Sequence, residues 1–305
     1  MKIIYKAPEG QRLVEEQYRR ILTYWPVANR QFHLPTRQGE TFVIECGEES
    51  APPVVLFHGA LANSASWLGE VALLAQCFRV FAVDVIGEPG LSASSRPPLD
   101  SDAYALWIDD VMSALRLDHA SFVGVSLGGW LALDYATRRP ARVDQLALVC
   151  PGGVGRQKIA ILFKVAFFNL CGRWGKRKLR DTILGPMRKG DVSPAMRKFG
   201  EFFALIHEST RPRKQRLPVF SDRALKGLTM PVLAIVGAKD VLLDSADTRR
   251  RIVSLLEKGD VRYIEEAGHF IPGQGTTVRE FLSCGLSGTR SSTSPTEAAR
   301  PVGQH

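Results

Sequence analysis

Gly124-Val125-Ser126-Leu127-Gly128 is the stretch of sequence that decides the fold. It ends the apolar run Ser121–Val125, which we predict to be a buried strand, and it opens the helical pattern Leu127–Arg138. A serine flanked by glycines at a strand-to-helix turn is typical of a nucleophile elbow, because the tight turn leaves no room for a flanking Cβ. The pattern predicts an exposed Ser126 hydroxyl beside the N–H groups that begin the helix.

Working outward, the same alternation of strand and helix recurs along the chain. Further buried strands are predicted at Val54–Phe57, Val80–Val83, Gln145–Val149 and Val232–Val236, and Val261–Ile264 is a further predicted strand. Helical patterns cover Gln11–Tyr24, Ala65–Gln76, Ala103–Leu117, Ala246–Leu256 and Thr276–Leu282. Two alternating segments, Gln31–Pro35 and Thr41–Glu45, are predicted edge strands. The pattern predicts an α/β fold with a mostly parallel central sheet and helices on both faces.

The alternation breaks after Pro151, where a long stretch contains helix-like segments and no clear strand. We interpret residues 153–226 as an inserted helical cap and residues 1–152 with 227–284 as the core. Residues 285–305 are mostly small and polar, so we expect a disordered tail.

Composition is ordinary for a globular protein, with 305 residues of which 45% are hydrophobic and 23% charged. The five cysteines are scattered without a CxxC pair, which argues against a disulfide framework and against a metal site such as zinc. The N-terminus lacks the apolar run of a signal peptide, and Lys164 interrupts the longest apolar stretch, Ile159–Leu170. We expect a soluble, cytoplasmic protein with reduced thiols and no membrane insertion.

A serine nucleophile needs a general base, and His269 is the candidate among six histidines. It follows the last predicted strand, in a loop that can return over Ser126. The early hairpin holds His33, a segment before the nucleophile strand holds His119, the cap holds His207 and the tail holds His305; we expect structural or surface roles for all four.

The acid of the triad should follow a strand that lies between the nucleophile and the histidine in the chain. Asp240 does so, at the end of Val236–Asp240. Asp244 and Asp247 are nearby alternatives, although Asp244 suits a helix N-cap better. No acid follows the preceding strand at Cys150-Pro151-Gly152, so Asp240 is favoured.

A tetrahedral oxyanion needs two N–H donors. One should be the amide of Leu127, directly after the nucleophile. The other should come from His58-Gly59-Ala60-Leu61, after the strand Val54–Phe57, and the Ala60 amide is the candidate. His58 is then a residue that shapes the loop.

Together these motifs resemble the α/β-hydrolase superfamily, specifically its cap-bearing, carboxylesterase-like bacterial members. The resemblance spans about residues 31–282 and rests on motifs in the family's order: His58-Gly59, Asp84-Val85-Ile86-Gly87, Gly124–Gly129, Gly237–Asp240 and Gly268-His269. The leading helix that ends in Trp25-Pro26-Val27 is also similar. The resemblance implies ester hydrolysis through an acyl-enzyme, without a cofactor.

One loop departs from the family pattern. The usual D-x-x-G-x-G-x-S stretch is one residue longer between its glycines, as Asp84-Val85-Ile86-Gly87-Glu88-Pro89-Gly90-Leu91-Ser92. This loop borders the pocket in the family, so analogies about substrate are weakened.

The positive charge of the chain is concentrated in the predicted cap. Residues 156–226 hold 18 Lys and Arg against 5 Asp and Glu, a net charge of +13, whereas the whole chain carries +9. Three interpretations stay open: a solvated basic surface, attraction of acidic substrates, or weak association with a membrane surface through the aromatic stretch Ile159–Leu170. No binding module for nucleic acid accompanies the charge, so we expect no nucleic-acid partner.

The predicted function is therefore hydrolysis of a small-molecule ester by Ser126, His269 and Asp240. A lactonase, a thioesterase or a carbon–carbon bond hydrolase would use the same site, and a non-enzymatic ligand receptor on a hydrolase fold is a further alternative. Fold alone does not decide between them.

Overall fold

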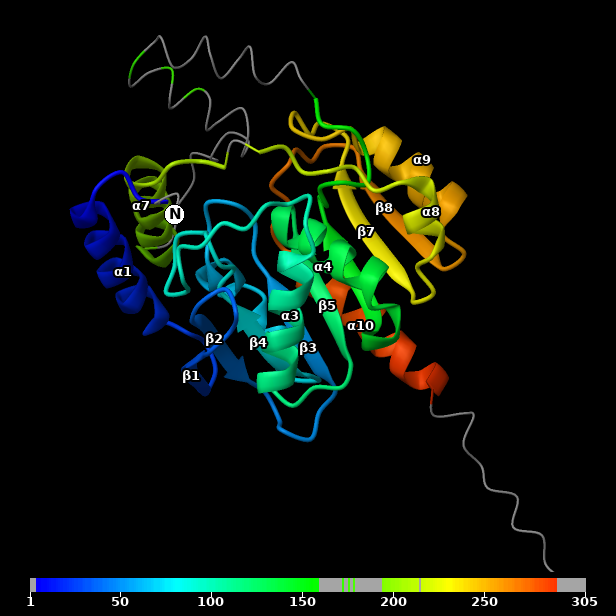
Figure 1. Ribbon diagram of the computed structural model, residues 1–305, viewed down its shortest axis with the longest axis horizontal. Coiled ribbons are helices and arrows are strands. Elements are labelled where there is room, and N and C mark those ends of the chain that lie inside the picture. Colours follow the sequence, from blue (N-terminus) through cyan, green and yellow to red (C-terminus); the bar gives the residue numbers. More distant parts are fainter. Residues whose placement is uncertain are drawn as a thin grey trace, which may run out of the picture.

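The computed structural model describes residues 4–158, 172, 175, 178, 194–213 and 215–289. Its centre is an eight-stranded sheet with the order β1-β2-β4-β3-β5-β6-β7-β8 (Figure 1). The strands are β1 (Asn29–Leu34), β2 (Thr41–Cys46), β3 (Pro53–Phe57), β4 (Arg79–Val83), β5 (Ala120–Val125), β6 (Val143–Val149), β7 (Val232–Gly237) and β8 (Gly259–Ile264).

The sheet is parallel from β4 to β8 and antiparallel at β1 and β2. The mostly parallel α/β sheet predicted from the sequence is confirmed. One expectation was wrong: β2 is not an edge strand, because it pairs with β1 on one side and β4 on the other and is buried throughout. Its register with β4 places Val43 opposite Val83. The alternation of polar and apolar residues in this strand therefore did not indicate an exposed sheet edge.

Helices cover both faces of the sheet, as Figure 1 shows. Alternate residues of β3 enter two different cores: Val55 and Phe57 pack on one face, Val54 and Leu56 on the other. The first core includes residues of α3 (Ala103–Ala114), α4 (Leu127–Arg138) and α9 (Ser245–Leu255). The second includes residues of α1 (Pro8–Leu22), α2 (Val71–Leu74) and α10 (Gly275–Thr289).

Two predicted helices differ from the observed ones. The continuous helix expected at Ala65–Gln76 is a short 3₁₀ helix, η1 (Ser64–Trp67), followed by α2. The Asn63 side chain caps η1 by accepting a hydrogen bond from the Ala65 amide, which starts this segment earlier and in a tighter form. At the other end of the chain, α10 continues through Thr289, past the predicted start of the tail at Gly285. Residues 290–305 lie outside the described residues.

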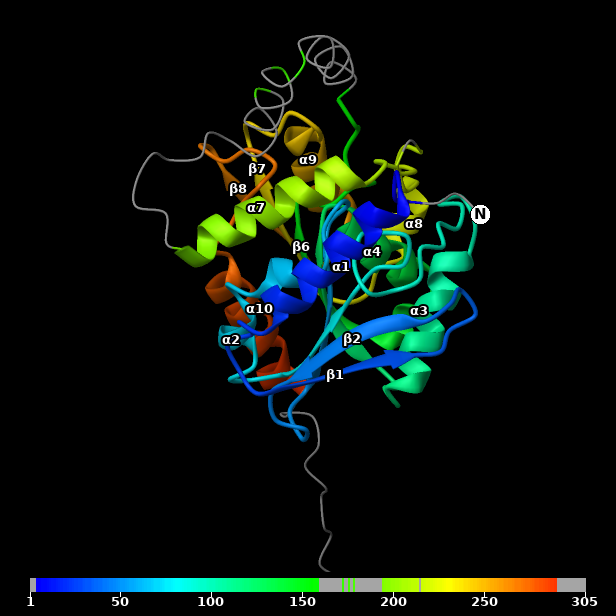
Figure 2. The ribbon, with the colours of Figure 1, turned by 90° about the vertical axis from the view of Figure 1, so that its left-hand side faces the viewer.

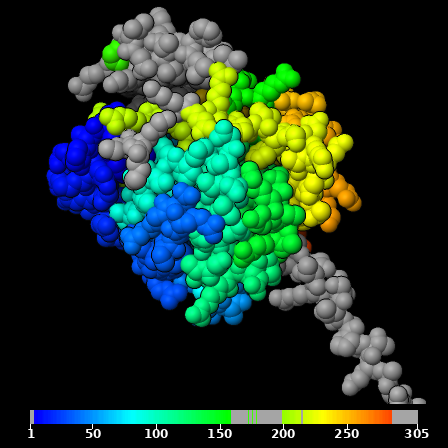
Figure 3. All heavy atoms as spheres, viewed as in Figure 1, coloured from blue at the N-terminus to red at the C-terminus, as the bar shows by residue number. Residues whose placement is uncertain are grey.

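Within the predicted cap, the structure describes α7 (Pro194–Ser209) and α8 (Asp222–Lys226). Helix α7 packs along α1, where Phe202 stacks on Tyr18 with ring centroids 5.9 Å apart (Figure 2). The Trp130 indole donates to the Pro218 carbonyl at 2.9 Å, so the chain before α8 lies on the core. In the space-filling view this connecting segment crosses the molecule from α1 toward α8 and α9 (Figure 3). Most of residues 159–193 lie outside the described residues, and the division into cap and core stays a prediction.

Candidate active site

Ser126 lies at the turn between β5 and α4, with a left-handed φ of 52°. Neighbouring backbone crowds the turn: a Cβ at Gly124 would lie 2.5 Å from the Gly128 carbonyl oxygen, and one at Gly128 would collide with that of Phe57. Glycine at both positions is therefore a steric requirement. A left-handed conformation at a serine is uncommon and costs about 1–3 kcal/mol, so the surrounding packing must hold it.

His269 reaches Ser126 from the loop after β8. Its Nε2 lies 3.1 Å from Ser126 Oγ, and its Nδ1 lies 2.7 Å from Asp240 Oδ2. Asp240 comes from the loop after β7, so loops at the carboxyl ends of β5, β7 and β8 bring the residues together. The structure thus places the three residues in one hydrogen-bonded chain.

The Asp240 carboxylate is buried and held in place. Its second oxygen, Oδ1, accepts hydrogen bonds from the amides of Leu242 and Leu243 at 2.7 and 3.0 Å. Burial by itself raises the pKa of Asp240, but the hydrogen bond with His269 and the two amides outweigh it, and the pKa is lowered. Asp240 is therefore ionised and accepts the Nδ1–H of His269, which leaves the Nε2 lone pair facing the Ser126 hydroxyl.

The alternative acids have other roles. Asp244 is the N-cap of α9, where its side chain accepts from the Asp247 amide at 3.0 Å, in agreement with the sequence-based expectation. Asp247 lies within the first turn of the same helix and forms an ion pair with Arg250. Neither residue forms a described contact with His269.

The two predicted oxyanion donors come from the residue after Ser126 and from the loop after β3. Leu127 is the first residue of α4, so its N–H has no acceptor within the helix. On the opposite side, a Cβ at Gly59 would lie 3.8 Å from Ser126 Cβ, so the backbone that leads to Ala60 passes next to the nucleophile. The following amide, that of Leu61, donates to Glu88 Oε2 at 2.8 Å and is already engaged.

His58 shapes this loop. Its Nε2 accepts from the Val85 amide at 2.9 Å, and its Nδ1 lies 2.8 Å from the Gly59 carbonyl oxygen. A backbone N–H only donates and a carbonyl only accepts, so the ring is neutral with its proton on Nδ1. Burial lowers the pKa of His58, consistent with this form.

The other histidines lie elsewhere. On the exposed face of β1, His33 contacts the Leu91 carbonyl at 3.2 Å, and His119 pairs with Asp144 near the start of β6. His207 is exposed on α7, with its ring against Phe203. His305 lies outside the described residues.

Sequence reasoning assigned no role to two groups near the site. Atoms of Cys150, Asp240 and His269 that are able to bind a metal all lie within 4.8 Å of one another, and Cys150 has a left-handed φ of 45°. Burial and the Asp240 carboxylate raise the pKa of the Cys150 thiol to about 12. The second group is Glu88, which belongs to the loop Asp84–Ser92. The unusual length of this loop was the only feature of the sequence that singled it out.

Known proteins match this chain over most of its length. The model of the alpha/beta hydrolase family matches residues 54–280, which run from within β3 into α10 and include every residue of the site. The chain belongs to the alpha/beta hydrolase family. In sequence, this hydrolase is 29% identical over 272 residues to an uncharacterized carboxylesterase, nap, of Bacillus subtilis (strain 168), covering 87% of this chain and 89% of that protein.

Two further comparisons also cover most of the chain. An uncharacterized protein of Mycobacterium tuberculosis (strain ATCC 25618 / H37Rv) is 40% identical over 245 residues, covering 72% of this chain and 71% of that protein. The crystal structure of carboxylesterase CesB (YbfK) from Bacillus subtilis superposes with a TM-score of 0.77 at 26% identity, covering 92% of this chain and 99% of that one. The hydrolase is thus similar to the carboxylesterase-like branch. Among the described residues, no helix has the length and apolar character needed to span a membrane.

Proposed function

We propose that this hydrolase cleaves carboxylic esters through an acyl-enzyme formed on Ser126. The observation that carries the proposal is the hydrogen-bonded chain from Ser126 Oγ to His269 Nε2 at 3.1 Å and from His269 Nδ1 to Asp240 Oδ2 at 2.7 Å. Both distances lie within the range in which a base takes a proton from a nucleophile.

In the first half of the reaction, His269 Nε2 takes the Ser126 proton as Oγ bonds to the carbonyl carbon. The electron pair of the carbonyl moves onto its oxygen, where the amides of Ala60 and Leu127 stabilise the negative charge. Asp240 holds the ring orientation and stabilises the imidazolium. When the tetrahedral intermediate collapses, the ester C–O bond breaks and His269 returns the proton to the leaving alcohol.

The second half repeats these steps with water. His269 takes a proton from the water, whose oxygen attacks the acyl carbon, and the same amides stabilise the second oxyanion. Collapse breaks the bond to Ser126 Oγ, which regains its proton from His269. The products are a carboxylic acid and the free enzyme.

The comparisons support esters as the substrate class, because two similar Bacillus proteins over nearly the whole chain are named carboxylesterases. The small-molecule ester and the cytoplasmic location remain proposals.

The test is hydrolysis of p-nitrophenyl esters of increasing acyl length by the wild type and by Ser126→Ala. We expect turnover by the wild type and a loss of at least about 10³-fold in the variant, because removal of the nucleophile leaves only binding and oxyanion stabilisation. Ser254→Ala, at an exposed position of α9, is the matched control and should retain full activity. Failure of the folded wild type to cleave any ester would contradict the proposal.

A further inference from the structure

The lengthened loop after β4 is tied closely to the loop after β3. Asp84 accepts hydrogen bonds from the Ser64 amide and hydroxyl at 2.9 and 2.7 Å, and the Asn63 side chain donates to the Pro89 carbonyl at 3.0 Å. These contacts hold the two loops at their outer ends. The candidate oxyanion residue Ala60 belongs to the same loop after β3.

Glu88 contacts the residue that follows Ala60. Its side chain is fully buried, and its Oε2 accepts the Leu61 N–H at 2.8 Å. That N–H shares a peptide plane with the Ala60 carbonyl, so the hydrogen bond fixes the rotation of the Ala60–Leu61 peptide. A rotated peptide would turn its carbonyl toward the Glu88 carboxylate, which repels it.

This fixation acts on a strained backbone. Leu61 has a φ of 55°, in the left-handed region that a leucine rarely adopts. Such a conformation costs on the order of 1–3 kcal/mol and persists only where contacts enforce it. The hydrogen bond to a buried carboxylate is a contact of the required strength, because charged acceptors form the stronger hydrogen bonds.

Two arginines pair with the Glu88 carboxylate, and one of them connects it to the segment after α7. Arg213 Nη2 lies 3.1 Å from Glu88 Oε1, and Arg96 Nη2 lies 3.7 Å from the same atom. Both arginine side chains are largely buried, so Glu88 is the charge that compensates them. Arg213 also donates to the Tyr104 hydroxyl at 2.7 Å.

We propose that Glu88 is a positioning residue for the oxyanion hole: by fixing the Ala60–Leu61 peptide, it limits rotation at Ala60, whose N–H belongs to the preceding peptide. The inference rests on the proposed function and gives a role to a residue of the lengthened loop. Arg213 and Arg96 are the counter-ions that keep the carboxylate in place.

The experiment compares two double variants, Glu88→Gln with Arg213→Met and Glu88→Ala with Arg213→Met. Both remove the carboxylate together with one buried guanidinium, and they differ in whether an oxygen remains to accept the Leu61 N–H. We expect the alanine form to have a kcat about 10- to 100-fold below that of the glutamine form, with KM within about twofold, since loss of one oxyanion donor costs about 10²–10³.

A second readout separates positioning from general stability. A trifluoromethyl ketone forms a tetrahedral adduct with an active-site serine, so its inhibition constant should weaken in parallel with kcat. Equal kcat values and equal inhibition constants for the two folded double variants would overturn the proposal.

If the alanine form does not fold, Glu88→Asp replaces it. This variant keeps the charge for both arginines and withdraws the acceptor from Leu61, so the same loss of kcat is expected, and unchanged kcat would overturn the proposal. The wild type and Ser126→Ala are assayed in parallel, because their difference tests the proposed function independently of Glu88.

Discussion

Asp240 Oδ2 lies 2.7 Å from His269 Nδ1, while the other oxygen of this carboxylate is held by two backbone amides of its own loop. The carboxylate is therefore fixed before a substrate binds, and it fixes the imidazole in turn. This preorganisation avoids a cost in reorganisation when charge develops on His269.

Replacement of Asp240 by Asn should lower kcat by about 10³- to 10⁴-fold with little change in KM. The amide keeps the shape, but an oxygen or an NH₂ group now faces Nδ1, and the imidazolium loses its counter-ion. Steady-state kinetics on a p-nitrophenyl ester measure the loss. Asp244→Asn is the matched control, and a comparable loss there would contradict the choice of Asp240.

Cys150 offers a second place from which an acid can reach His269. Its sulfur belongs to the cluster in which the Asp240 and His269 atoms lie within 4.8 Å, and its left-handed φ of 45° is one that Asp tolerates better than most residues. Cys150→Asp in the Asp240→Asn background should therefore recover kcat by about tenfold or more, a tenfold change being 1.4 kcal/mol.

Cys150→Asn in the same background is the control, because it has the shape of aspartate without the charge. A recovery of the same size with asparagine would show that packing, rather than a relocated carboxylate, restores activity.

Stability should fall in acid, partly because of Asp240. The pKa of this buried residue is lower in the folded protein than its ordinary value of about 4. Its contribution to the free energy of unfolding is therefore complete above about pH 4 and is lost as the pH falls through the lowered pKa. Urea unfolding from pH 7 to pH 3 should show a shallower decline for Asp240→Asn than for the wild type.

Some decline should remain in that variant, because the pKa values of Glu45, Asp110 and Asp247 are also lowered. A decline as steep as that of the wild type would show that Asp240 contributes nothing to the pH dependence of the free energy of unfolding.

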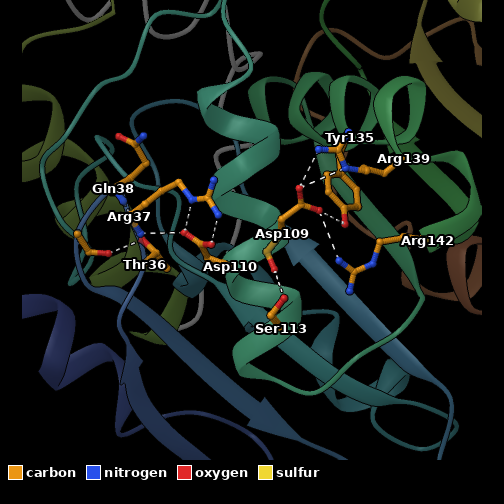
Figure 4. Close-up of polar contacts among 10 residues, drawn as sticks. Thr36, Arg37, Gln38, Asp109, Asp110, Ser113, Tyr135, Arg139 and Arg142 are labelled. Carbon is orange, nitrogen blue, oxygen red and sulfur yellow. Dashed lines mark hydrogen bonds and ion pairs between the residues drawn. The ribbon is translucent and has the colours of Figure 1, made fainter.

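Asp109 on α3 connects three segments of the core far from Ser126. It accepts hydrogen bonds from the Tyr135 hydroxyl at 3.0 Å, Arg139 at 3.2 Å and Arg142 at 3.4 Å (Figure 4). Asp109→Ala removes the acceptor of the Tyr135 hydroxyl and both ion pairs, while Arg139 and Arg142 keep their bonds to backbone carbonyls. It should cost about 1–3 kcal/mol in the free energy of unfolding, with kcat unchanged. Its neighbour Asp110 pairs with the exposed Arg37, so Asp110→Ala should cost less. Denaturant unfolding of both variants measures the two losses, and the loss for Asp109→Ala should be the larger.

The elements that sequence reasoning predicted well are those whose local pattern fixes their environment. The buried strand before Ser126, the elbow and helix α4 followed from adjacent residues, and α4 has the predicted bounds Leu127–Arg138. The helix expected at Ala65–Gln76 is instead the short 3₁₀ helix η1 followed by α2. Local pattern could not predict this, because the contact of Ser64 with Asp84 at the start of η1 forms only when the two loops are folded together.

The same limit applies to Glu88. Its partners Leu61 and Arg213 are 27 and 125 positions away in the chain, and no periodicity connects them. The extra residue in the loop was visible in the sequence, whereas the contact that gives it a role needed the tertiary structure. Ser126, His269 and Asp240 could be proposed from the sequence because the family order of strand ends relates them.

The measurement that tests the central claim most directly is covalent labelling by a fluorophosphonate, followed by intact-mass and peptide analysis. The probe reacts with a serine that is activated by a base and stabilised by an oxyanion hole. We predict one adduct per chain on the peptide that contains Ser126, none in Ser126→Ala, and greatly slowed labelling in His269→Ala. An adduct on another residue, or esterase activity that persists in Ser126→Ala, would contradict this account.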